Sequence, residues 1–305
     1  ERHQTLRATL DWSYNLLPPA EQTLFRRLAI FVGGWTLEAA ESVCGAESAS
    51  GGVGSEDVLN LMEQLINKSL VSAEEAGGES RYRMLETMRQ YANEKLVESG
   101  ESDALRDRHL DYFLTLVETA EPHLRKTEQI EWLPRLDVEV ENLRAALSWS
   151  LDIPSAESAL RLAGALGSFW DMRAFWKESA KWMDQALGRK WDENSKTEKS
   201  ARGKVLYHRA DIASAMDEMD VMKTSAESAL VLCEDGKDLC GTAYARARVA
   251  EYLSRIGDVN ASKVRFEQSL AEFQKLGDAW GESVVFSGLM AVVVSLGDIE
   301  KYAEN

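Results

Sequence analysis

The chain has 305 residues and a net charge of −16, because 51 Asp and Glu side chains outnumber 35 Lys and Arg side chains. This charge has the wrong sign for broad contact with nucleic-acid backbones or anionic lipid. The length of 305 residues predicts about two domains, and the 45% of hydrophobic residues can form sizeable cores and argue against disorder. No stretch approaches the roughly 20 uncharged apolar residues that cross a bilayer, so we expect no membrane-spanning segment.

The cysteines suggest the compartment of the protein, and the chain ends suggest that the sequence is partial. Cys44, Cys233 and Cys240 are too few and too scattered for a disulfide framework or a zinc site of the usual spacing. We therefore expect a reducing, cytoplasmic setting. The sequence opens on Glu1 instead of a methionine and stops where a new helix is expected to begin, so we expect a piece of a longer protein.

Residues 1–100 predict a compact domain of helices followed by one β-hairpin. Four helices are expected, at 6–17, 21–30, 36–44 and 57–67. Pro18-Pro19 stops the first helix, and a Gly- and Ser-rich loop at 45–55 precedes the fourth. Residues 70–84 are expected to form a hairpin that turns at Gly77-Gly78. Helices followed by one hairpin is the order typical of a winged helix.

Beyond the hairpin the periodicity is helical throughout. Further helices are expected at about 85–99, 103–121, 139–152, 156–169 and 174–188. Pro122, Pro134 and Pro154 each fall between these runs, where a helix breaker belongs. We expect residues 101–153 to be connecting helices and residues 154–305 to form an array of helical hairpins.

An internal repeat supports the array. Gly257-Asp258 recurs 40 residues later as Gly297-Asp298. A small residue followed by leucine recurs 43 and then 40 residues apart, at 186–187, 229–230 and 269–270. Such periods indicate stacked units that bury their apolar faces only against one another. The sequence therefore predicts a mainly α protein, with a winged helix followed by an α-solenoid that is incomplete at the C-terminus.

These hairpins resemble the tetratricopeptide family. Its pattern is matched by Ala250, Gly257-Asp258, Phe266, Ser269 and Leu270. The period of about 40 residues exceeds the 34 residues of that family. Ser262 and Ser269 also stand where the family usually has alanine. We therefore expect long, divergent repeats.

The N-terminal region carries a more specific resemblance. The segments concerned are RHQTL at 2–6, DWSY at 11–14, LAIFVGGWTLEAA at 28–40 and YRMLETMRQYA at 82–92. They are similar to the winged helix of bacterial STAND regulators, signal-transduction ATPases with numerous domains. The resemblance implies a nucleotide-binding module that uses ATP or ADP upstream of the winged helix, and a repeat sensor after it.

The chain itself carries no motif for that nucleotide chemistry. Gly203-Lys204 and Gly236-Lys237 are its only Gly-Lys pairs, and neither is followed by the Ser or Thr of a P-loop. No serine or cysteine lies in a nucleophile-elbow pattern, and no histidine has the companions of a metal site. We expect no enzyme activity, no cofactor and no metal in this part of the protein.

Direct contact with nucleic acid is not expected either. The helix at 57–67 would be the recognition helix, yet it holds Asp57 and Glu63 and no basic residue before Lys68. The first 100 residues contain nine Lys and Arg against 15 Asp and Glu, a net charge of −6. A small basic strip remains beside the wing, and we expect solvated ion pairs for its members, Arg81, Arg83 and Arg89.

Candidate binding residues lie on the first helix of each hairpin, which lines the inner groove of a superhelix. They are Lys204, Tyr207 and Asp211, followed one period on by Tyr244, Glu251 and Arg255. We expect these side chains to be exposed on one concave surface, where they bind an effector molecule or a partner protein. The winged helix would then relay binding to the nucleotide-binding module. An ordinary solvated face, and a constitutive scaffold for protein partners without a nucleotide switch, remain open alternatives.

Overall fold

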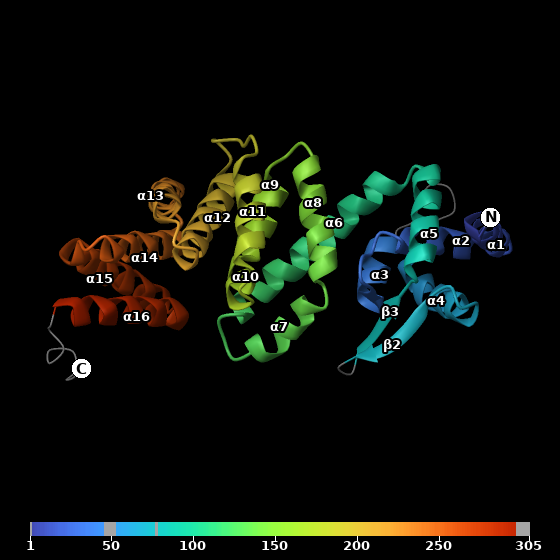
Figure 1. The fold of residues 1–305 in the computed structure, drawn as a ribbon, viewed down its shortest axis with the longest axis horizontal. Helices are drawn as coiled ribbons and strands as arrows, with labels where there is room; N and C mark the ends of the chain where they lie inside the picture. Colours follow the sequence, from blue (N-terminus) through green and yellow to red (C-terminus); the bar gives the residue numbers. More distant parts are fainter. Residues whose placement is uncertain (1, 46–52, 77–78, 297–305) are drawn as a thin grey trace. The chain divides into compact units, whose positions relative to one another are not determined.

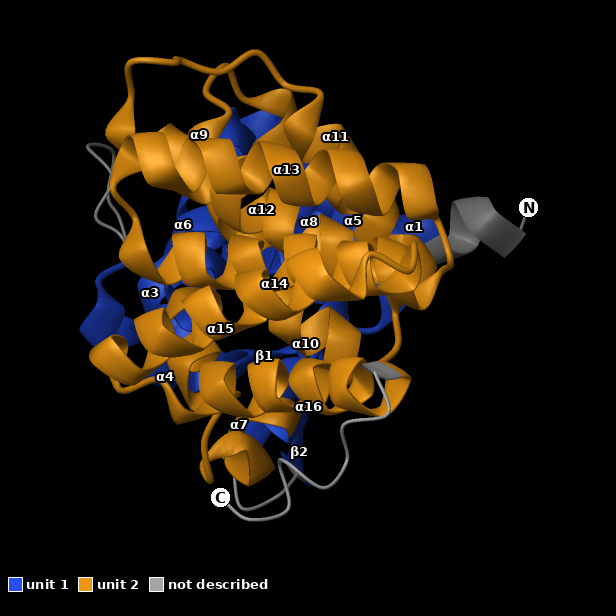
Figure 2. Ribbon diagram, turned by 90° about the vertical axis from the view of Figure 1, so that its left-hand side faces the viewer, with its two compact units in different colours: residues 1–116, 134–149 blue, residues 117–133, 150–305 orange. Residues whose placement is uncertain are grey.

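The computed structural model describes residues 2–45, 53–76 and 79–296 (Figure 1). The chain divides into two compact units, which we describe separately (Figure 2). The first, the winged-helix unit, comprises residues 1–116 and 134–149; the second, the repeat unit, comprises residues 117–133 and 150–305. Segment 101–153, expected to connect two domains, is thus divided between the units.

The winged-helix unit begins with four short helices and a small sheet. Its elements are α1 (Arg2–Asn15), α2 (Pro19–Leu28), β1 (Trp35–Thr36), α3 (Leu37–Cys44), η1 (Ser55–Asp57), α4 (Val58–Asn67), β2 (Ser72–Ala76), β3 (Glu79–Arg83), α5 (Glu86–Ser99), the first part of α6 (Ser102–Ala120), the end of α7 (Gln129–Asp137) and most of α8 (Val140–Asp152). The four expected helices and the hairpin are confirmed. The expected turn at Gly77-Gly78 and most of the loop at 45–55 lie outside the described residues.

The sheet has three strands in the order β1-β3-β2, all antiparallel, and β1 was not predicted. Two residues are too short for an alternating pattern to show in the sequence, and Trp35 pairs with Tyr82 only through the tertiary fold. Gly34 precedes β1 with φ +105°, and a Cβ there would lie 2.7 Å from the Tyr82 carbonyl oxygen. The second glycine of the VGG segment is therefore required by the close approach of β3.

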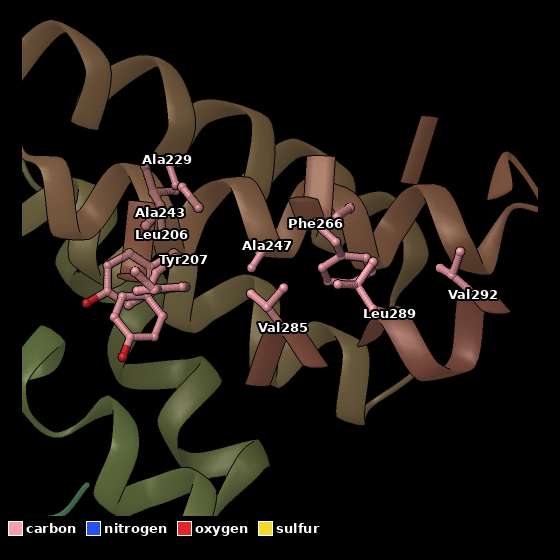
Figure 3. Close-up of a cluster of buried hydrophobic side chains, with 13 residues drawn as sticks. Leu206, Tyr207, Ala229, Ala243, Ala247, Phe266, Val285, Leu289 and Val292 are labelled. Carbon is pink, nitrogen blue, oxygen red and sulfur yellow. The ribbon is translucent and has the colours of Figure 1, made fainter. Parts of the chain in front are cut away.

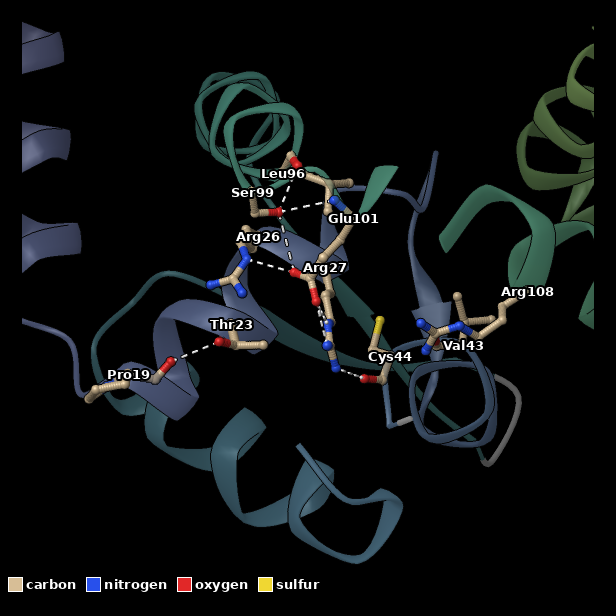
Figure 4. A network of polar contacts seen from close by, with 10 residues as sticks. All are labelled: Pro19, Thr23, Arg26, Arg27, Val43, Cys44, Leu96, Ser99, Glu101 and Arg108. Atoms are coloured by element: carbon tan, nitrogen blue, oxygen red, sulfur yellow. Dashed lines mark hydrogen bonds and ion pairs between the residues drawn. The ribbon is translucent and has the colours of Figure 1, made fainter. Parts of the chain in front are cut away.

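A buried arginine joins α2 to the turn between α5 and α6 (Figure 4). Arg27 is 1% exposed and donates to Glu101 Oε1 at 2.5 Å and to the Cys44 carbonyl at 2.8 Å. Arg26 donates to the other Glu101 oxygen at 2.9 Å. Burial by itself would raise the pKa of Glu101, but hydrogen bonds from Arg27 and Arg26 hold it below its usual value. The single carboxylate of Glu101 thus accepts hydrogen bonds from two guanidinium groups.

The repeat unit consists of helices that pack in sequence. They are η2 (Glu121–His123), α9 (Glu157–Ala165), α10 (Gly167–Met172), α11 (Trp176–Leu187), α12 (Lys196–Ala215), α13 (Met219–Gly236), α14 (Leu239–Arg255), α15 (Val259–Leu276) and α16 (Ala279–Leu296). Helix α12 packs on α13 and α14, and α14 packs on α15 and α16. This alternation is that of stacked hairpins, so the mainly α fold with helical pairs after a winged helix is confirmed.

Two of the expected boundaries are wrong. The run at 156–169 is two helices, α9 and α10, and Gly167 at the start of α10 allows His208 to approach so closely that a Cβ would lie 2.3 Å from its ring. Pro134 lies inside α7, not between helices. A helix of nine residues is too short for its periodicity to outweigh the proline in the sequence pattern.

Buried serines explain where the repeats depart from the tetratricopeptide pattern. Ser262 and Ser269 on α15 are fully buried. Ser262 Oγ donates to the Ala250 carbonyl at 2.7 Å, and Ser269 Oγ donates to the Ala243 carbonyl at 2.8 Å. Each buried hydroxyl thus has a hydrogen-bond partner on α14. Serine is also small enough for α14 and α15 to approach each other closely.

The recurring Gly-Asp pair has a local backbone role. Gly257 adopts φ +85° after the end of α14, a left-handed conformation that favours glycine. The Asp258 carboxylate accepts a hydrogen bond at 3.2 Å from the backbone N–H of Ala261, which caps α15. The later copy, Gly297-Asp298, lies outside the described residues. Within the described part of the chain, no helix is long and apolar enough to span a membrane.

Candidate functional site

The six candidate residues lie on α12 and α14, but they do not form one exposed stripe. Lys204 is partly exposed and is paired with Glu121, its Nζ lying 2.8 Å from one carboxylate oxygen. Asp211, Glu251 and Arg255 are also partly exposed; their exposed side-chain fractions are 23%, 28% and 38%. Tyr207 and Tyr244, however, are each only 3% exposed. The expectation of exposed tyrosines is therefore wrong.

The two tyrosines pack against each other because they occupy like positions on neighbouring first helices. Their rings are stacked, with centroids 5.4 Å apart and planes 21° apart. Tyr244 also meets Phe273 edge-on at 4.7 Å and donates its hydroxyl to Asp278 Oδ2 at 2.8 Å. Both tyrosines belong to the buried cluster that runs from α12 to α16, in which Figure 3 labels Tyr207. An aromatic residue repeated in one register is thus a sign of packing between layers.

A cavity of about 550 Å³ lies within the repeat unit, a size typical of sites for small molecules. It is lined by residues of α10, α12, α14, α15 and α16 and by Arg125, which follows η2. Four of the six candidates contribute to its lining, namely Asp211, Tyr244, Glu251 and Arg255. Lys204 and Tyr207 do not.

An ion-pair network fills one wall of the cavity, centred on Arg248, which sequence reasoning missed. Arg248 Nη1 lies 2.5 Å from Asp211 Oδ1 and 2.7 Å from Glu251 Oε2. Glu251 also accepts a hydrogen bond from Ser214 and lies 3.8 Å from Arg255 Nε. Arg248 follows Tyr244 by four residues, so helical spacing placed it on the same stripe. Its only signal in the sequence was this spacing.

Burial sets the protonation of two groups in this wall. Burial raises the pKa of Asp211 to about 7, against the opposing charge of Arg248 and with repulsion from Glu251. Burial also lowers the pKa of His208 well below its usual value, and the neighbouring Arg125 lowers it further. The imidazole is therefore neutral at pH 7, and the cations of the lining are arginines.

Arg125 forms no ion pair within this network, although its charge lowers the pKa values of Asp211 and His208. Its Nε and Nη2 lie 3.3 and 3.1 Å from Ser168 Oγ, and its guanidinium lies 4.5 Å from the centroid of the Tyr244 ring. Among the residues that the structure describes, no carboxylate forms an ion pair with Arg125. Sequence reasoning missed it, because Arg125 precedes the repeats and belongs to no periodic helix.

Other residues of the lining are apolar. Met172, Phe266, Trp280 and Val284 contribute to it, and Trp280 is 39% exposed. Guanidinium groups, carboxylates and an apolar wall can hold and orient a molecule, but the lining offers no serine or cysteine paired with a base. The described residues also contain no group of three or more His, Cys, Asp or Glu that could hold a metal ion.

Helix α4, the expected recognition helix, contains no Lys or Arg side chain. On α4 the exposed side chains include Leu59, Asn60 and Glu63. Lys68, just after α4, is bonded to the Glu21 carboxylate. This arrangement agrees with the acidic character of the sequence in that region.

The expected basic strip beside the wing is partly wrong. Arg83 and Arg89 are paired at the surface with Glu74 and Glu86, as expected. Arg81 is instead buried, at 5% exposure, and bonded to Glu139. Its Nη2 also donates to the carbonyls of Val138 and Gly34 at 2.7 and 3.2 Å. Arg81 is therefore a structural residue of the unit and no part of a phosphate-binding surface.

Similar proteins place these observations in context. The family model described as "Winged helix-turn-helix domain" matches residues 17–97. The chain is 34% identical over 284 residues to a proposed HTH-type transcriptional regulator of Mycobacterium tuberculosis, covering 92% of the chain and 31% of that protein. It is 42% identical over 106 residues to an uncharacterized protein of the same species, covering 35% of the chain and 26% of that protein. The chain thus spans about a third of the length of these relatives or less.

One solved structure with a similar fold is a STAND protein with a tetratricopeptide repeat sensor from Pyrococcus horikoshii. The match covers 93% of the chain and 42% of that protein, with 15% identity and a TM-score of 0.49. The family match coincides with the helices and hairpin that the structure places between α2 and α5. Residues 17–97 of this chain therefore form a winged helix-turn-helix domain.

Proposed function

We propose that this chain is the winged-helix and sensor region of a STAND-type transcription regulator. In this proposal the repeat unit binds an effector, and the winged helix relays binding to an upstream nucleotide-binding module that holds ATP or ADP. The observation that carries it is the winged helix-turn-helix domain followed by stacked hairpins that enclose a cavity of about 550 Å³. The names given to the relatives support a role in transcription.

The second candidate is a constitutive scaffold whose repeats dock protein partners without a nucleotide switch. The coding sequence upstream of Glu1 separates the two. A G-x-x-x-x-G-K-[ST] motif there, together with ATP binding by the longer protein, supports the switch. A gene in which no such motif precedes the winged helix would leave the scaffold as the better explanation.

We predict that residues 1–305 alone neither bind ATP tightly nor hydrolyse it. The reason is that neither Gly203-Lys204 nor Gly236-Lys237 is followed by Ser or Thr, and both pairs lie in or at the end of helices, not in a phosphate-cradling loop. Isothermal titration calorimetry with Mg-ATP should show no saturable heat. A dissociation constant in the micromolar range would contradict the prediction.

We also predict that the winged helix does not bind duplex DNA specifically at physiological salt. Phosphate contact requires free Lys or Arg side chains, and Lys68 and Arg81 are both engaged by carboxylates. A gel shift with random-sequence and promoter DNA should therefore show no complex that survives competitor DNA. A shift abolished by Asn60→Ala and Lys68→Ala would instead assign DNA contact to α4 and its end.

A further inference from the structure

Arg125 is a cation without a carboxylate partner in a cavity whose other arginines are paired. Arg248 is held by Asp211 and Glu251, and Arg255 lies 3.5 Å from Asp217. Arg125 interacts with the hydroxyls of Ser168 and Tyr207 and with the face of Tyr244. The Glu121 carboxylate acts on it at longer range, but no described carboxylate forms an ion pair with it. A partly buried guanidinium is stabilised best by an anion that satisfies its planar fork of donors. The cavity therefore contains one guanidinium to which no described side chain contributes an ion-paired carboxylate.

The surrounding charges limit that anion to a single negative charge. Asp171, Asp211 and Glu251 also line the cavity, and they would repel a doubly charged phosphate more strongly than a carboxylate. A carboxylate can accept two parallel hydrogen bonds from one guanidinium. Arg248 and Arg255 are already paired with acidic side chains, so Arg125 is the remaining cation of the lining, and a monoanionic carboxylate matches its single charge.

The apolar residues of the lining indicate which kind of group the rest of the ligand contains. Trp280 and Val284 of α16 and Met172 of α10 supply an apolar wall, and Trp280 keeps 39% of its surface exposed. Burying such a surface favours an apolar or aromatic group, and aromatic side chains dominate the energetics of such contacts. A volume of about 550 Å³ is typical of sites for molecules of metabolite size.

We propose that this cavity binds a small organic carboxylate with an apolar or aromatic body, and that Arg125 binds the carboxylate. The inference rests on the proposed function, since it names the chemical class of the effector. Ser168 positions the guanidinium through its hydroxyl, and the ring of Tyr244 supports the opposite face. The ion-pair network of Arg248 fixes the wall and leaves Arg125 available for the ligand.

The test uses cinnamate as the probe, with cinnamamide and phenyl phosphate as its neutral and dianionic counterparts. Ligand-detected NMR and calorimetry on the 305-residue chain should show saturable binding of cinnamate, with binding of cinnamamide and phenyl phosphate at least about tenfold weaker. Arg125→Gln should weaken the binding of cinnamate by about tenfold or more. Arg125→Lys should have an intermediate effect, because lysine keeps the positive charge but lacks the two parallel N–H donors of the guanidinium group.

Arg202 provides a matched control. Its guanidinium also stacks on an aromatic ring, that of Trp191 at 5.2 Å, and donates to the Leu187 carbonyl, but it lies outside the cavity. Arg202→Gln should therefore bind cinnamate like the wild type. Circular dichroism and the melting temperature show whether each variant remains folded, and Arg125→Lys replaces Arg125→Gln if the latter does not.

Several outcomes overturn the inference. They are an absence of saturable cinnamate binding, equal binding of cinnamate and cinnamamide, tighter binding of phenyl phosphate, and an equal loss in the Arg125 and Arg202 variants. The proposed function fails separately, if no P-loop precedes the winged helix. Binding of cinnamate in that case would leave a carboxylate-binding repeat unit without a nucleotide switch.

Discussion

Tyr207→Ala and Tyr244→Ala should each lower the free energy of unfolding of the repeat unit by about 3–5 kcal/mol. Both rings are 97% buried and stack on each other, so truncation leaves a cavity in the layer between α12 and α14. Had the tyrosines lined an open groove, the loss would stay within about 0.5 kcal/mol. Urea unfolding followed by circular dichroism measures the difference.

Two control variants separate ring packing from other effects. Val264→Ala on α15 removes a side chain that is 52% exposed and should change stability by no more than about 0.5 kcal/mol. Tyr244→Phe keeps the ring and removes the hydrogen bond to Asp278, which should cost about 1 kcal/mol. If both alanine variants lost less than about 1 kcal/mol, the tyrosines would not be core residues and would return to the list of ligand contacts.

Glu101→Gln should destabilise the winged-helix unit by about 3 kcal/mol. The variant leaves Arg27, at 1% exposure, without its carboxylate, and removal of one partner from a buried ion pair costs about 3–5 kcal/mol. We expect the lower end of that range because the side chain of Glu101 is 21% exposed and water reaches it. Denaturant unfolding at pH 7 measures the loss.

The same pair gives a dependence on pH with a defined sign. Because the folded state holds the pKa of Glu101 below the usual value of 4.5, the carboxylate stabilises the fold above that pH. This contribution declines as the pH falls below 4.5, so wild type and Glu101→Gln should converge in stability there. Glu74→Gln is the control, because the Arg83–Glu74 pair is more than half exposed and should contribute at most about 0.5 kcal/mol. Equal effects of the two substitutions would contradict the assignment of Arg27 as a buried partner.

Local patterns in the sequence predicted most of the helices and the hairpin. Each depends on residues close in the chain: Pro19 at the start of α2, Thr36 capping α3 by accepting from Ala39 N, and the Gly257-Asp258 turn. The acidic character of α4 was equally a property of one short segment. Such features are decided by backbone conformation, capping and spacing, and the amino-acid sequence contains them directly.

The residues of the candidate site were also predicted only in part from local patterns. Helical spacing singled out Asp211, Glu251 and Arg255, and these residues line the cavity. The sequence could not show that Tyr207 and Tyr244 are buried, because an inner stripe is open or filled according to which side chains from other helices meet it.

Only the tertiary structure decided the partners of the charged groups. Arg125 reaches Tyr244 across more than a hundred residues of sequence, and Glu101 reaches Arg27 across 74. The sequence by itself thus determined most of the elements, their order and the acidic character of α4. Burial, ion pairing and the cavity depend on contacts between segments far apart in the chain, whose energies exist only once those segments are packed together.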